Sequence, residues 1–228
     1  SNGEIAVTLS HIKAIHTAYK MGLQQAIIME DDISFEFLDL IPARVFFRVL
    51  NSIPPSIGIL QLNWGESSQS ACKFENNFFI KNIPKNTSCS CAGTYLITRK
   101  GMLDVLSHCV RGDPSLYFIT PTSYKPMVPR FGQADDYIFQ LTRLATTGIP
   151  MFYPSNTDFG LSTITDRPGN HNEEHIYQYK RVLEKYTELK EKEILELAGK
   201  HQFTKNVFMF WEGPTWKLIT LLQKIAIK

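Results

Sequence analysis

Ala26-Ile27-Ile28-Met29-Glu30-Asp31-Asp32 is the stretch that predicts the fold, because a short apolar run ends there in three acidic residues. The run is partly β-branched, which is typical of a strand buried on both faces of a sheet. Acidic side chains directly after such a strand lie at its carboxyl end, where open α/β sheets bind their ligands. The sequence therefore predicts a ligand site at Glu30, Asp31 and Asp32.

The chemistry of this acidic triplet indicates a metal ion. Adjacent carboxylates repel each other, and a divalent cation removes that repulsion. Hard oxygen ligands suit Mg²⁺ or Mn²⁺, which keep coordination positions open for phosphate oxygens. We therefore interpret Glu30, Asp31 and Asp32 as candidate metal ligands. The alternative is a solvated acidic turn that also helps to cap the next helix.

Around this strand, the hydrophobic pattern predicts alternating helices and strands. Helices are expected over residues 8–21, 35–50, 99–109, 135–145 and 175–198, with Pro42 interrupting the second. Strands are expected over residues 24–29, 57–63, 78–81, 92–98 and 151–153, and loops over 64–77, 113–129 and 155–172. Such an alternation predicts an α/β layered fold.

The composition of the 228-residue chain is that of an ordinary globular protein, with 43% hydrophobic and 20% charged residues. It excludes disordered, collagenous and disulfide-framework proteins. The 24 basic and 22 acidic residues give a net charge of +2, so no electrostatic signal for nucleic acid is present. No stretch approaches the roughly 18 apolar residues that span a bilayer.

The compartment is suggested by the first residues and the cysteines. Residues 1–10 lack the charged and apolar regions of a signal peptide, which favours the cytoplasm, with membrane association and the ER or Golgi lumen left open. The sequon at Asn86 would matter only in a secretory compartment. The cysteines match no zinc-binding spacing and are compatible with reduced thiols; they are Cys72, Cys89, Cys91 and Cys109.

Other candidate site residues lie further along the chain. Asp135 and Asp136 open a predicted helix, where a carboxylate can act as a general base toward a hydroxyl or only complement the helix dipole. His171 lies in a Gly-containing loop that could fold over a metal site or stand in solvent. Gly93 and Thr94 precede the apolar pair Leu96-Ile97 in the predicted strand 92–98, where a glycine lets the backbone approach a ligand closely or forms a bulge.

Several of these motifs occur in the order found in glycosyltransferase family 25, which includes lipopolysaccharide-biosynthesis sugar transferases and procollagen galactosyltransferases. The segments that resemble the family's motifs are Gly3-Glu4-Ile5 with Leu9-Ser10-His11, Ala26 to Asp32, Gly93 to Gly101, Asp135-Asp136-Tyr137 and Ser162-Thr163-Ile164. The resemblance covers roughly residues 3 to 166.

This resemblance implies a GT-A, Rossmann-like fold with a mixed sheet flanked by helices, a UDP-sugar donor and Mn²⁺ or Mg²⁺. It places Glu30, Asp31 and Asp32 at the metal, Asp135 or Asp136 near the acceptor, and Ser10, His11, Gly93 and Thr94 at the donor. His171 as a further metal ligand is an analogy to other GT-A enzymes.

The implied reaction transfers galactose or glucose, with inversion, to a hydroxyl of a glycan or glycoprotein. The alternative is a non-catalytic carbohydrate-binding or scaffolding module of a larger glycan-building enzyme. A phosphoryl-transfer enzyme is disfavoured, because no Gly-rich phosphate loop with Lys is present.

Both ends of the sequence bear on the domain organisation. Family members carry residues before Gly3 that hold a first, nucleotide-binding strand. Because the sequence opens near Gly3, the expectation is either a fragment without that strand or a base held in a different way. The segment Lys205 to Pro214 resembles the opening strand of capsular-polysaccharide sugar transferases, with a helix expected from Trp216 to Lys228. We therefore expect a transferase domain over residues 1–200. Residues 201–228 are expected to begin a second transferase domain or to form a helical tail.

Overall fold

The computed structural model describes residues 2–63, 80–84, 91–109, 134–154, 171–188, 208–211 and 217–219. Within these residues the chain forms one seven-stranded sheet, in the order β4-β6-β3-β5-β1-β8-β9, and a two-stranded sheet of β2 and β7. The strands are β1 (Gln25–Met29), β2 (Ile33–Ser34), β3 (Ile59–Gln61), β4 (Ile80–Asn82), β5 (Thr94–Thr98), β6 (Leu144–Thr147), β7 (Tyr153–Pro154), β8 (Phe208–Trp211) and β9 (Lys217–Ile219). The helices are α1 (Asn2–Lys20), α2 (Glu36–Leu40), α3 (Ala43–Asn51), α4 (Arg99–Cys109), α5 (Ala134–Gln140) and α6 (His171–Glu188).

The main sheet is mixed: the central strand β5 and the edge strands β4 and β9 pair antiparallel with their neighbours. β5 pairs antiparallel with β1 on one side, with Ile28 opposite Tyr95, and antiparallel with β3 on the other. β1 and β3 therefore run in the same direction, and β6 is parallel to β3. The apolar run of β1 is fully buried, as the sequence predicts for a strand covered on both faces.

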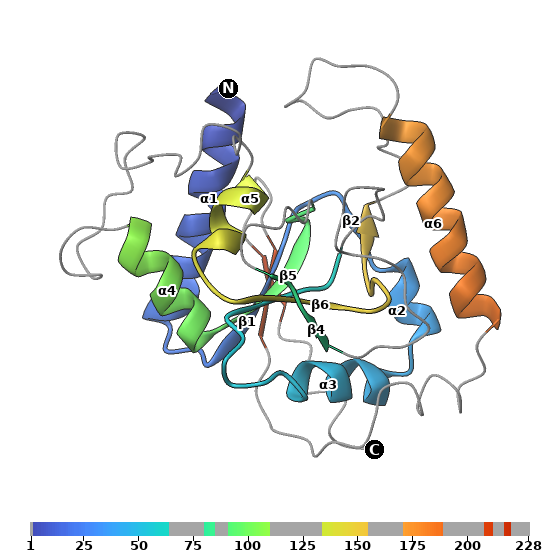
Figure 1. The fold of residues 1–228 in the computed structure, drawn as a ribbon, viewed down its shortest axis with the longest axis horizontal. Coiled ribbons are helices and arrows are strands. Elements are labelled where there is room, and N and C mark those ends of the chain that lie inside the picture. Colours follow the sequence, from blue (N-terminus) through green and yellow to red (C-terminus); the bar gives the residue numbers. More distant parts are fainter. Residues whose placement is uncertain are drawn as a thin grey trace.

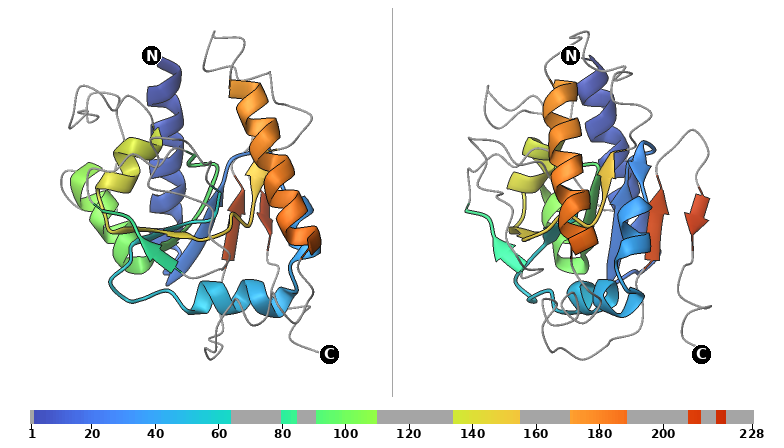
Figure 2. Two further views of the ribbon diagram at one scale, coloured as in Figure 1. Left: turned by 45° about the vertical axis from the view of Figure 1, so that its right-hand side comes forward. Right: turned by 90° about the vertical axis from the view of Figure 1, so that its right-hand side faces the viewer.

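Helices cover both faces of this sheet (Figure 1). One apolar core lies between the sheet and α1, α4 and α5, and includes Ile15, Ile28 and Met102. The other lies between the sheet and α2, α3 and α6, and includes Ile27, Phe37 and Tyr179. The two views in Figure 2 show α1 and α6 on opposite sides of the strands. The described residues thus form the mixed α/β fold with a helix-flanked sheet that the sequence predicts.

The parallel neighbour of β1 comes from the far end of the sequence. Ala26 pairs with Phe208 and Met29 with Trp211, and β8 then pairs with β9. Figure 2 shows these two strands at the end of the sheet. A strand within the segment 205–214 agrees with the sequence analysis. The helix expected from Trp216 is wrong at Lys217–Ile219, which pair as a strand with β8.

The interruption expected at Pro42 is confirmed. Pro42 lacks a backbone N–H, and the predicted helix over 35–50 is divided into α2 and α3. Other elements differ from the prediction. The helix expected over 135–145 ends at Gln140, because the next residues form β6 against β3. The β-branched pair Thr146 and Thr147 favours that strand. Residues Ile33–Ser34 also form a strand, β2. A strand of 2 residues is too short to show an alternating hydrophobic pattern in the sequence.

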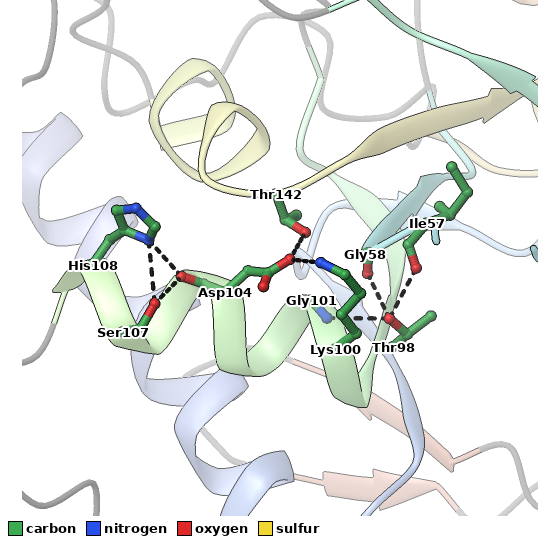
Figure 3. A network of polar contacts seen from close by, with 9 residues as sticks. All are labelled: Ile57, Gly58, Thr98, Lys100, Gly101, Asp104, Ser107, His108 and Thr142. Carbon is green, nitrogen blue, oxygen red and sulfur yellow. Dashed lines mark hydrogen bonds and ion pairs between the residues drawn. The ribbon is translucent and has the colours of Figure 1, made fainter. Parts of the chain in front are cut away.

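Helix α4 approaches the sheet unusually closely where it passes β3 (Figure 3). The Thr98 hydroxyl donates to the carbonyl of Ile57 at 3.0 Å and accepts from the backbone N–H of Gly101 at 3.1 Å. A Cβ at Gly101 would lie 2.2 Å from the carbonyl oxygen of Gly58. The Asp104 carboxylate of α4 is paired with Lys100 and accepts from the hydroxyl of the buried Thr142 at 2.6 Å. The absence of a side chain at Gly101 therefore allows α4 to lie this close to Gly58, the residue before β3.

In the part of the chain that the structure describes, no helix combines the length and apolar character needed to cross a membrane. Neither Cys91 nor Cys109 forms a disulfide. Cys72 and Cys89 lie outside the described residues.

The buried thiol of Cys109 is expected to lower the free energy of unfolding at alkaline pH. Burial raises the pKa of its thiol from 9.0 to about 11, partly offset by the hydrogen bond to the Tyr137 hydroxyl. Below pH 9 both the folded and the unfolded chain hold this proton, whereas between pH 9 and 11 only the unfolded chain releases it. We expect the free energy of unfolding to fall by about 2 kcal/mol more in the wild type than in Cys109→Ala over this range. Urea unfolding at pH 8 and pH 10.5 measures the difference, and equal losses in both proteins would contradict the prediction.

Candidate functional site

The acidic triplet lies at an edge of the sheet where three strands begin or end. β1 and β3 point in the same direction, so their carboxyl ends meet the amino end of β5 there. The backbone N–H of Glu30 donates to the carbonyl of Gly93 at 2.8 Å, and that of Asn63 donates to the carbonyl of Thr94 at 3.1 Å. Glu30 and Asn63 are therefore fixed on either side of the residues that lead into β5.

The three carboxylates of the triplet differ in exposure. The Glu30 side chain is 35% exposed, while Asp31 and Asp32 are exposed in the turn between β1 and β2. The capping alternative is not supported at α2, because its Ncap residue, Phe35, gives no side-chain cap and Glu36 N–H bonds to the Ser34 hydroxyl at 3.1 Å. The triplet thus lies at the carboxyl end of a buried strand, with Asp31 and Asp32 exposed and Glu30 partly exposed.

His11 contacts Glu30 from the buried side of the site. It lies on the buried face of α1 with Ile15 and Ala18, at 0% exposure. Its Nε2 is 3.1 Å from Glu30 Oε1, and its Nδ1 is 3.1 Å from the Tyr95 hydroxyl. The imidazole also stacks on the Tyr95 ring, with centroids 5.7 Å apart and planes inclined by 25°. Contacts on both ring nitrogens and one ring face therefore fix the imidazole beneath the triplet.

Within the described part of the chain, two buried polar atoms at this edge have no hydrogen-bond partner, namely Asn63 Oδ1 and Thr94 Oγ1. Asn63 is 1% exposed and Thr94 is 0% exposed. Buried polar atoms are nearly always paired, so each such exception needs an explanation, and a ligand group is one. Gly93 makes room for the Asn63 amide, because a Cβ there would lie 2.7 Å from Asn63 Nδ2.

The segment before Gly93 connects the site to Asp135. Cys91 has φ of 84°, a left-handed conformation uncommon for a residue with a side chain. Its N–H donates to Asp135 Oδ2 at 2.9 Å, and its carbonyl accepts from Gln61 Nε2 at 2.8 Å. Asp135 is 8% exposed, so its carboxylate is largely buried where α5 begins. Hydrogen bonds from α5 and β3 therefore hold Cys91 in this conformation.

The structure brings several predicted site residues into one network. His11 contacts Glu30, Glu30 bonds to Gly93, and Cys91, two residues before Gly93, bonds to Asp135. Thr94 lies in the same edge, opposite Met29. The full burial of His11 means that this side chain faces Glu30 and Tyr95, and not an open surface.

The other predicted site residues lie on α1, α5 and α6 or outside the described residues. Ser10 is half-buried on α1, next to His11. Asp136 lies in the first turn of α5, and its side chain is outside the described part. His171 was expected in a loop, and this is wrong, since α6 begins at that residue. Ser162, Thr163 and Ile164 also lie outside the described residues.

No group of three or more His, Cys, Asp or Glu side chains suited to a metal ion occurs among the described residues. The predicted metal ligands Glu30, Asp31 and Asp32 therefore form no protein-only cage with other described residues, and the His171 side chain lies outside the described part. Mg²⁺ sites that serve phosphate substrates often use only one or two carboxylates, with water and phosphate oxygens completing the shell.

Sequence reasoning missed Asn63, Gln61 and the conformation of Cys91. Asn63 ends a predicted strand whose carboxyl end reaches the same edge as Glu30, and that position was a usable signal. Cys91 is held by Gln61, 30 residues before it, and by Asp135, 44 residues beyond it, and nothing local in the sequence indicates either contact.

No protein-family model matches the chain. No curated protein sequence is significantly similar to it either.

Proposed function

We propose that the chain is a metal-dependent glycosyltransferase of the GT-A type. It would transfer galactose or glucose from a UDP-sugar to a hydroxyl of a glycan or glycoprotein. The observation that supports this most is the meeting of exposed carboxylates with buried, unpartnered polar atoms at one carboxyl edge of the sheet. Ligands of open α/β sheets bind at such an edge.

The residues at this edge fit a divalent cation with a diphosphate. Glu30 and Asp32 offer hard oxygen atoms, which Mg²⁺ and Mn²⁺ prefer. Asn63 Oδ1 and Thr94 Oγ1 are orphaned polar atoms at the same edge. A cation bound there would neutralise the charge that develops on the diphosphate as it leaves.

The acceptor would be activated by a carboxylate at the start of α5. The acceptor oxygen would attack the anomeric carbon while the bond to the diphosphate breaks, and the hydroxyl proton would pass to Asp135 or Asp136. The hydrogen bond from Cys91 holds the Asp135 carboxylate in one orientation. A single displacement of this kind inverts the configuration of the sugar.

Ligand-induced stabilisation tests the proposal. We expect UDP-galactose or UDP-glucose to raise the melting temperature in the presence of Mn²⁺ and to have little effect with EDTA. At about 100 times the Kd, binding adds about 2.7 kcal/mol to the free energy of unfolding. For a chain of this size, that is a rise of roughly 5–10 °C.

The same titration distinguishes a glycosyltransferase from the alternative, a non-catalytic module. A non-catalytic carbohydrate-binding module would be stabilised by a free glycan without Mn²⁺ and would not respond to any UDP-sugar. Release of UDP, followed in parallel with a panel of glycan acceptors, shows whether a donor that binds is also used.

A further inference from the structure

We propose that His11 is a positioning residue, which holds the Glu30 carboxylate in the orientation that binds a divalent cation. This inference rests on the proposed function, since it assumes that Glu30 is a metal ligand. It assigns His11 a role without direct contact to the donor, unlike the role implied by the family resemblance.

The hydrogen-bond geometry determines which nitrogen serves Glu30. An ionised carboxylate can only accept hydrogen bonds, so Nε2 of His11 must carry the hydrogen that points to Glu30 Oε1, 3.1 Å away. In the neutral imidazole, Nδ1 then accepts the hydrogen of the Tyr95 hydroxyl, also at 3.1 Å. The Glu30 carboxylate therefore selects the tautomer with hydrogen on Nε2, and the Tyr95 hydroxyl complements that tautomer by donating to Nδ1.

The surroundings of the imidazole prevent it from turning away. His11 and Tyr95 are both at 0% exposure, and Tyr95 packs edge-on against Phe139 with centroids 5.5 Å apart. The His11 ring stacks on Tyr95 from the other element, α1. Because α1 and β5 each hold one member of the pair, the donor nitrogen has a fixed place beneath the sheet edge.

Glu30 has the exposure that this role requires. The Glu30 side chain is 35% exposed, while the His11 Nε2–H from which it accepts a hydrogen bond is buried. A carboxylate has about four lone-pair sites, so one bond from His11 leaves oxygen sites for a cation on the outer side. Hydrogen-bond partners that orient metal ligands are worth about 10- to 100-fold in metal affinity.

Two amide replacements of His11 provide a matched test. Gln places its amide nitrogen near the former Nε2 and can still donate to Glu30, whereas the shorter Asn places it near Nδ1, toward Tyr95. We expect His11→Gln to keep Mn²⁺ affinity within about threefold and His11→Asn to lose about 10- to 100-fold. The loss of free Mn²⁺ signal in electron paramagnetic resonance measures the affinity directly, without any transfer assay. Thermal unfolding of the metal-free proteins shows that both variants fold.

A double-mutant cycle separates positioning from general structural support. In a Glu30→Gln background, His11→Asn should have little further effect on Mn²⁺ binding, because the group that His11 orients is already altered. Equal affinities for the two His11 variants, or equal losses with and without Glu30→Gln, would overturn the inference while leaving the metal site in place. A wild-type protein that binds no Mn²⁺ would instead overturn the proposed function together with this role.

Discussion

Asp32→Asn is expected to lower the rate of sugar transfer by about 1000-fold or more while leaving the fold intact. Asp32 is exposed in the turn after β1, so the loss of one charge there should change the free energy of unfolding by less than about 0.5 kcal/mol. A cation on a leaving group supplies several kcal/mol of transition-state stabilisation, and each 1.36 kcal/mol corresponds to a factor of about ten. The rate of UDP release under saturating donor and Mn²⁺ measures the effect.

The matched control for this variant is Asp39→Asn. Asp39 is also an exposed aspartate, but it lies on α2, away from the carboxyl ends of β1 and β3. The control should retain wild-type transfer, because it removes the same charge without touching the proposed site. Full activity in Asp32→Asn would remove Asp32 from the reaction, and equal losses in both variants would point to a general effect of charge.

Gly101→Ala is expected to destabilise the fold by about 3 kcal/mol, although alanine is the better helix former by about 1 kcal/mol. The new Cβ would lie 2.2 Å from the carbonyl oxygen and 2.6 Å from the carbonyl carbon of Gly58. These are backbone atoms that cannot rotate away, so α4 must move off the sheet (Figure 3). The corresponding fall in melting temperature is roughly 6–12 °C.

Ser107→Ala is the control on the same helix. Ser107 is exposed on α4, and its replacement should change stability by no more than about 0.5 kcal/mol. Urea unfolding of both variants gives the comparison. A Gly101→Ala protein as stable as the wild type would mean that α4 and β3 do not approach as closely as the structure indicates.

Local patterns in the sequence predict much of the sheet and most of the helices. The apolar run 26–29 becomes β1, and residues 99–109 form α4 with the predicted bounds. Elements whose identity depends on distant partners are less predictable. Leu144 and Ala145 fall within the predicted helix 135–145, yet they belong to β6 because β3 offers backbone hydrogen bonds there. The parallel partner of β1 is separated from it by about 180 residues, and local propensity gives no information about such a pairing.

The candidate site can likewise be predicted only in part from the sequence. The placement of Glu30, Asp31 and Asp32 at the end of a buried strand follows from the sequence, because the apolar run and the acidic residues are contiguous. That Asn63 is buried with an unpartnered oxygen, and that Cys91 bonds to Asp135, depends on how strands and helices pack. No spacing along the chain encodes those distances.

By itself, the sequence determined that an acidic cluster follows a fully buried strand in an alternating α/β chain, because both features are properties of adjacent residues. Only the tertiary structure decided that His11 lies beneath Glu30 with Tyr95 behind it. Those three residues are spread over 85 positions from His11 to Tyr95, and they meet because α1 packs on the sheet at the point where β1 and β5 pair. Burial against two elements at once is what turns an ordinary helix histidine into a fixed hydrogen-bond donor.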